Sequence, residues 1–67
     1  MFYVVNMRAQ SNGDHEVHRI GCRSFPKPEN RKALGEFSGC VGAVAMARRY
    51  YPGADGCAIC CPQCHTR

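Results

Sequence analysis

Apolar and polar positions along the first third of the chain predict two strands. Residues 2–7 are rich in aromatic and β-branched side chains, a composition typical of strands. The tripeptide Asn12-Gly13-Asp14 then indicates a turn, because Asn and Gly both tolerate a positive φ. Residues 15–20 alternate loosely between polar and apolar side chains. We therefore predict a hairpin with strands at about 2–7 and 15–20.

The middle of the chain predicts a loop, a third strand and one helix. Pro26 and Pro28 exclude a helix interior or a central strand around them. Residues 33–37 are a short strand candidate, and a helix is expected over about 39–51, where Ser38 could act as the N-cap and Pro52 would stop it. One face of that helix would carry Cys40, Val44, Ala47 and Tyr51, with Val41 and Ala43 beside it.

These elements predict a single α+β domain over residues 1–67. Its three-stranded antiparallel sheet would be packed by one helix and followed by a cysteine-rich tail at 55–67. In a three-stranded meander the helix starts at one end of the sheet and finishes at the other. The tail would then begin near Cys22 and far from Cys40.

A chain of 67 residues is marginal as an independent domain, since it buries only about 60% of the surface that its unfolded form exposes. Domains of this size usually add disulfides, a metal or a partner subunit. The chain has six cysteines and few large apolar side chains. We therefore expect a covalent or metal staple.

Four of the six cysteines fall close together near the C-terminus. They are Cys57, Cys60, Cys61 and Cys64, followed directly by His65. Thiolates and imidazole are the ligands that zinc prefers, and a closed structural site needs four of them. We predict a structural zinc site formed by Cys57, Cys60 and Cys64 and completed by Cys22 or His65. The domain would act as a binding or regulatory module and not as an enzyme.

Three other interpretations of the cysteines stay open. Six cysteines also suit a disulfide framework without metal. A thiol redox protein is a further alternative, with Cys40 as a thiolate in the first helical turn, although a buried core cysteine is the simpler interpretation. The segment from Cys61 to His65 also matches the C-x-x-C-H signature of c-type haem attachment, but nothing after it would enclose a haem.

His15 and His18 invite a second metal hypothesis. Residues three apart on a strand face opposite sides of the sheet, so these two cannot share one ion without a bulge. We expect both to be solvent-facing or hydrogen-bonded.

The charge balance points only weakly to a partner. The net charge is +4, and Arg48 and Arg49 could contact nucleic acid, but no stacking aromatic pattern accompanies them. An unidentified protein partner is the main expectation.

No segment has the run of about 18 apolar residues that a membrane helix needs. Without an export signal, a cytoplasmic location is expected, where clustered cysteines more often bind metal than form disulfides.

Four short strings carry a resemblance over nearly the whole chain. They are the residues 12–18, Leu34-Gly35-Glu36-Phe37, Asp55-Gly56-Cys57 and Cys64-His65-Thr66. In these strings the chain resembles short uncharacterised bacterial proteins of a hairpin-strand-helix type with a cysteine-rich tail. The resemblance implies a bacterial setting and brings no activity with it.

Overall fold

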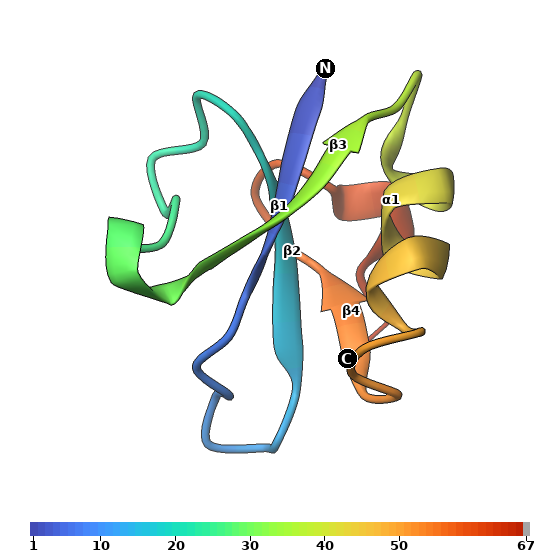
Figure 1. The fold of residues 1–67 in the computed structure, drawn as a ribbon. Helices are drawn as coiled ribbons and strands as arrows, with labels where there is room; N and C mark the ends of the chain where they lie inside the picture. Colours follow the sequence, from blue (N-terminus) through green and yellow to red (C-terminus); the bar gives the residue numbers. More distant parts are fainter. Residues whose placement is uncertain (67) are drawn as a thin grey trace.

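The computed structural model describes residues 1–66 and contains a four-stranded sheet with one α-helix. The strands are β1 (Phe2–Asn6), β2 (His15–Arg19), β3 (Arg31–Glu36) and β4 (Ala54–Gly56). The helix α1 spans Cys40–Ala47, and two short 3-10 turns, η1 (Pro28–Asn30) and η2 (Pro62–Cys64), lie in the loops (Figure 1). The predicted α+β class is confirmed.

The sheet differs from the predicted one in size, order and strand direction. Its order is β3-β1-β2-β4, so β1 lies between β2 and β3 and pairs with both in the antiparallel sense. The fourth strand pairs with β2 in parallel, from His15 opposite Ala54 to Val17 opposite Gly56. The three-stranded antiparallel sheet is therefore corrected to a four-stranded mixed one.

The loop between β2 and β3 explains the change in strand direction. It leaves β2 at the end of the sheet near Phe2 and returns to the other end, where the N–H of Met7 donates to the carbonyl of Asn30 at 2.7 Å. From there β3 runs back until Glu36 lies opposite Phe2. As a result α1 begins at the same end of the sheet where β2 finishes. The prediction that Cys40 lies far from the tail is wrong for this reason.

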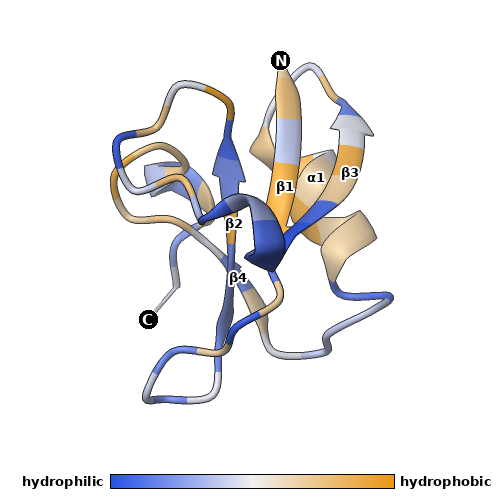
Figure 2. Cartoon of the chain, turned by 60° about the vertical axis from the view of Figure 1, so that its left-hand side comes forward, coloured by the Kyte–Doolittle hydropathy of each residue, from blue (hydrophilic) through white to orange (hydrophobic). Residues whose placement is uncertain are grey.

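The hydrophobic core lies between the sheet and α1. Alternation along the strands turns Tyr3, Val5 and Val17 toward the helix, which contributes Cys40, Ala43, Val44 and Ala47. Ala54 and Cys61 complete this buried cluster. Figure 2 shows the hydrophobic residues along β1 and α1, while η1 is hydrophilic.

The opposite face of the sheet is also covered. Val4 and His18 are directly paired across β1 and β2, and both are at most 2% exposed. The loop after β2, with Pro26 buried, runs on the side of the sheet away from α1 (Figure 1). His18 is thus held by strand pairing in a place without contact to bulk water.

The helix is shorter than its sequence pattern indicates. It ends at Ala47, and the N–H groups of Tyr50 and Tyr51 both donate to the Ala47 carbonyl. Its N-cap is Gly39 in an extended conformation and not Ser38. The predicted buried face holds at Cys40, Val44 and Ala47, but Val41 is 73% exposed.

Candidate metal centre

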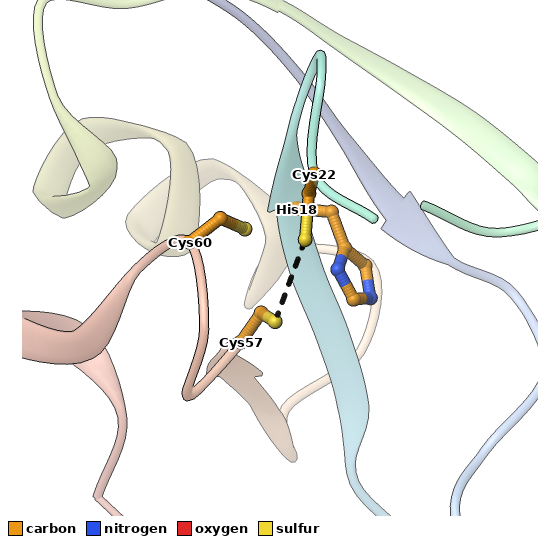
Figure 3. Close-up of side chains that lie close together, drawn as sticks. All are labelled: His18, Cys22, Cys57 and Cys60. Atoms are coloured by element: carbon orange, nitrogen blue, oxygen red, sulfur yellow. Dashed lines mark hydrogen bonds between the residues drawn. The ribbon is translucent and has the colours of Figure 1, made fainter. Parts of the chain in front are cut away.

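Four potential metal ligands converge at the end of the sheet where β2 and β4 finish. They are His18, Cys22, Cys57 and Cys60, and one ligand atom from each lies within 4.8 Å of all the others. The first three residues are buried and Cys60 is half-buried. Figure 3 shows the side chains turned toward one another around a common centre. The group can hold a metal ion.

The first two members come from β2 and the turn that follows it. His18 is the fourth residue of β2, and Gly21 adopts a φ of 91°, a conformation that a residue with a Cβ rarely takes. The turn closes with the N–H of Cys22 donating to the carbonyl of Arg19 at 3.2 Å. This reversal brings the Cys22 sulfur beside the ring of His18 (Figure 3).

The other two members follow β4, which places them through its pairing with β2. The N–H of Cys57 extends that pairing by donating to the carbonyl of Val17 at 2.9 Å. A turn then begins, in which the N–H of Cys61 donates to the carbonyl of Cys57 at 2.8 Å, and this turn points Cys60 back toward β2. Gly56 is required just before the turn, because a Cβ there would lie 2.7 Å from the Cβ of Cys64.

Backbone N–H groups donate to the sulfurs of all three cysteines in the group. Ser24 donates to the Cys22 sulfur, Ile59 to the Cys57 sulfur and Arg19 to the Cys60 sulfur, each at 3.4 Å. Hydrogen bonds from backbone N–H groups favour the charged form of an acceptor. The backbone is therefore arranged to support thiolates, which are the form of cysteine that binds metals.

The imidazole of His18 has one nitrogen engaged and one free for a metal. Its Nε2 lies 3.4 Å from Oε1 of Glu16, whereas its buried Nδ1 has no hydrogen-bond partner among residues 1–66. A buried polar atom without a partner is costly, and a metal ion would satisfy it. A ligating histidine commonly donates its other ring N–H to a carboxylate, as the position of Glu16 allows.

Burial favours the uncharged forms of both His18 and Cys60. It lowers the pKa of His18, with the nearby Glu16 carboxylate acting in the opposite direction. Burial also raises the pKa of the Cys60 thiol, although the hydrogen bond from the N–H of Arg19 opposes this. A neutral imidazole is ready to bind a metal, whereas the Cys60 thiol must release its proton when a cation arrives.

The structure brings together three of the five residues predicted as ligands. Cys22, Cys57 and Cys60 belong to the group. The predicted meander does not account for Cys22, because the tail starts with Asp55 opposite Glu16 and reaches Cys22 only by running parallel to β2. Cys64 lies outside it, because it forms a disulfide with Cys40 near the start of α1. This pairing follows from the strand order, since α1 begins at the end of the sheet to which the tail returns.

His65 is also outside the group. Its Nδ1 lies 3.0 Å from the carbonyl oxygen of Gly56 and 3.4 Å from Oδ2 of the buried Asp55. Thr66 approaches the same carboxylate, with its N–H at 2.9 Å from Oδ2 and its hydroxyl at 2.8 Å from Oδ1. The carboxylate of Asp55 therefore holds residues 65 and 66 against β4, and the His65 ring takes part in these contacts.

His18 is the one member of the group that the sequence pattern does not predict. Strand alternation correctly separates it from His15, whose ring stacks on Tyr51 at a centroid distance of 3.9 Å. The relevant signal was the spacing His18-x-x-x-Cys22 with a glycine between the two residues. Combined with Cys57-x-x-Cys60, this spacing forms two ligand pairs from two segments.

Cys61, Arg48 and Arg49 lie outside the group of four potential ligands. Cys61 is buried in the core cluster, and its sulfur lies 3.8 Å from that of Cys60. Arg48 donates from Nε to the carbonyl of Ala54 at 3.0 Å and lies 3.8 Å from the Asp55 carboxylate. Arg49 is exposed.

Comparisons with known proteins leave the centre to be interpreted from its geometry. No protein-family model, curated protein or solved structure matches this chain. Among the residues described, no helix is long and apolar enough to cross a membrane.

Proposed function

We propose that the chain is a small zinc-binding domain in which His18, Cys22, Cys57 and Cys60 hold one structural zinc ion. The observation that carries the proposal is the convergence of three sulfurs and one imidazole nitrogen within 4.8 Å. Three thiolates and one imidazole are an established donor set for tetrahedral zinc. Soft sulfur donors of this kind disfavour magnesium and calcium, which prefer oxygen.

The burial of the donors supports a structural role in preference to a catalytic one. Four protein ligands complete a tetrahedral zinc shell, whereas a catalytic zinc keeps a position for water or substrate. His18, Cys22 and Cys57 are each at most 8% exposed. The ion would join the turn after β2 to the turn after β4, which are far apart in the sequence.

We further propose that the domain acts in binding or regulation. A metal that fixes two turns on a small sheet stabilises a surface and performs no chemistry of its own. Four expectations stay predictions: a protein partner, weaker contacts of Arg48 and Arg49 with nucleic acid, a bacterial setting and a cytoplasmic location.

A disulfide-stapled domain is the second candidate, and the Cys40–Cys64 disulfide favours it. This bond links the start of α1 to η2 across a sequence separation of 24. It lies outside the four-residue group, so the two staples are compatible. The domain we propose uses both.

Mass spectrometry under native and denaturing conditions tests the proposal. The native protein should carry one zinc ion, and the denatured chain should weigh two hydrogens less than the fully reduced chain. Alkylation without reduction should then label four cysteines, because Cys40 and Cys64 are joined. A folded protein that takes up no zinc when the ion is supplied would overturn the proposal.

Two variants separate ligation from general damage. Cys57→Ser removes a ligand and should abolish tight zinc binding. Cys61→Ala removes a buried cysteine outside the group and should retain one zinc ion. Equal zinc loss in both variants would contradict the assignment of ligands.

A further inference from the structure

The sulfurs of Cys22 and Cys57 lie 4.0 Å apart in the buried interior of the candidate centre (Figure 3). The two residues are separated by 35 positions in the sequence and follow different strands, β2 and β4. Both are at most 8% exposed, so neither sulfur is free to turn away into solvent. A shift of about 2 Å would bring the pair to the length of a disulfide bond.

We propose that these two sulfurs make the centre a redox switch, in which zinc and a Cys22–Cys57 disulfide are mutually exclusive. This inference rests on the zinc site proposed above. Oxidation of the pair would consume two of the four ligands and leave only His18 and Cys60. Because the thiolate and not the disulfide is the metal ligand, the ion would be released.

The Cys60–Cys61 pair is less suited to a lasting bond. The sulfurs of Cys60 and Cys61 are 3.8 Å apart, but these residues are neighbours in the chain. Adjacent Cα atoms are about 3.8 Å apart across a trans peptide, below the usual range of about 4.4–6.8 Å for disulfides. The Cys22–Cys57 bond would instead join the two segments that the metal joins, and the fold would keep a staple in either state.

Cys60 provides the entry point for an oxidant, because it is the one cysteine of the group that is half-buried. Hydrogen peroxide would convert its thiolate to a sulfenic acid and release hydroxide. The Cys22 thiolate would attack that sulfur, forming a Cys22–Cys60 disulfide and releasing a second hydroxide. The Cys57 thiolate would then attack the Cys22 sulfur and displace the Cys60 thiolate. The net reaction oxidises two thiolates and reduces one peroxide to two hydroxide ions.

The test follows zinc and disulfides together in the whole chain. Zinc-loaded protein is treated with hydrogen peroxide, released zinc is measured with a chromogenic chelator, and cross-links are mapped by mass spectrometry of a non-reduced digest. We expect loss of one zinc ion per chain, a further loss of two hydrogens and a Cys22–Cys57 cross-link. Reduction followed by added zinc should restore binding. Retained zinc, or release accompanied by a Cys60–Cys61 bond or a Cys60 sulfinic acid, would overturn the switch.

A control variant and a metal-free sample show which proposal a negative result contradicts. Cys61→Ala should release zinc as the wild type does, and loss of the response in a folded Cys61→Ala protein would also overturn the switch. Metal-free protein is oxidised in parallel, because the Cys22–Cys57 bond should form there without zinc. If the protein binds no zinc but this bond forms, the zinc proposal fails and the switch fails with it, and only the oxidation of the Cys22–Cys57 pair stands. If zinc binds and the bond forms in neither sample, the switch fails alone.

Discussion

Replacing His18 with alanine tests the one ligand of the proposed centre that the sequence pattern does not predict. His18 is 1% exposed, its Nε2 is 3.4 Å from Glu16, and its Nδ1 has no partner among the described residues. The sequence pattern places His65 in the candidate ligand set and leaves His18 out. We expect His18→Ala to weaken zinc binding strongly and His65→Ala to leave it almost unchanged.

The size of the effect follows from the number of ligands. Structural zinc sites contribute about 10–16 kcal/mol of apparent binding free energy, so one ligand of four accounts for roughly 2.5–4 kcal/mol. That difference corresponds to a loss in affinity of about 10²- to 10³-fold. His65→Ala should change the affinity less than about threefold, because substitutions away from a site usually alter free energies by about 0.5 kcal/mol or less.

The assay is a competition titration against a chelator of known zinc affinity at one pH and ionic strength. Circular dichroism on the same samples reports whether each variant is folded before zinc is added. His18→Ala also removes a buried ring, so the metal-free variant is expected to be less stable than the wild type.

A rescue variant keeps the test decisive even if His18→Ala fails to fold. His18→Cys restores a zinc ligand, and the longer zinc–sulfur bond partly compensates for the shorter side chain. It should bind zinc at least 10-fold more tightly than His18→Ala. Equal zinc affinities for wild type and a folded His18→Ala protein, or a larger loss in His65→Ala, would refute the proposed ligand set.

Three other predictions follow from the same contacts. Glu16→Gln should weaken zinc binding by about 10- to 100-fold in a chelator competition, since it removes the carboxylate beside the ligating histidine, and an unchanged affinity would remove Glu16 from the site. Replacing both Cys40 and Cys64 with alanine should lower the free energy of unfolding by about 3–4 kcal/mol in a urea titration, because the disulfide closes a loop with a sequence separation of 24, while zinc stoichiometry stays at one. The metal-free protein should lose stability below about pH 6.5, because its lowered pKa makes folded His18 accept a proton less readily than the unfolded chain. It should also lose stability above about pH 8.5, because the raised pKa of Cys60 keeps a proton on the folded chain that the unfolded chain releases. Urea titrations across pH test both limbs, and a flat profile from pH 5 to 9.5 would contradict them.

Local sequence pattern was sufficient to predict β1 and β2. β1 is built from aromatic and β-branched residues, and β2 follows a strong turn signal. β4 was not foreseeable in this way, because Ala-Asp-Gly has little strand preference and is ordered by parallel pairing with β2. The order β3-β1-β2-β4 depends on the path of the loop after β2, and its prolines do not reveal that path.

The same loop limited what could be predicted of the centre. Cys57 and Cys60 follow from their spacing. The expectation of Cys22 depends on a tail that starts beside the end of β2, whereas β4 first runs parallel to β2 before the tail reaches Cys22. The partner of Cys64 depends on which end of the sheet α1 starts from, and the predicted meander placed Cys40 at the wrong end. The strand spacing between His15 and His18 excludes a shared ion and so points away from His18 as a ligand. Its true companion, Cys22, lies beyond the end of the strand.

Zinc K-edge X-ray absorption on the wild-type protein is the most direct test of the central claim. The proposed ligands predict three sulfurs at about 2.3 Å and one nitrogen at about 2.0–2.1 Å from the metal. The nitrogen signal should disappear in His18→Cys, leaving four sulfurs, and persist in His65→Ala. A wild-type shell of four sulfurs, or one whose nitrogen is lost in His65→Ala, would contradict the centre formed by His18, Cys22, Cys57 and Cys60.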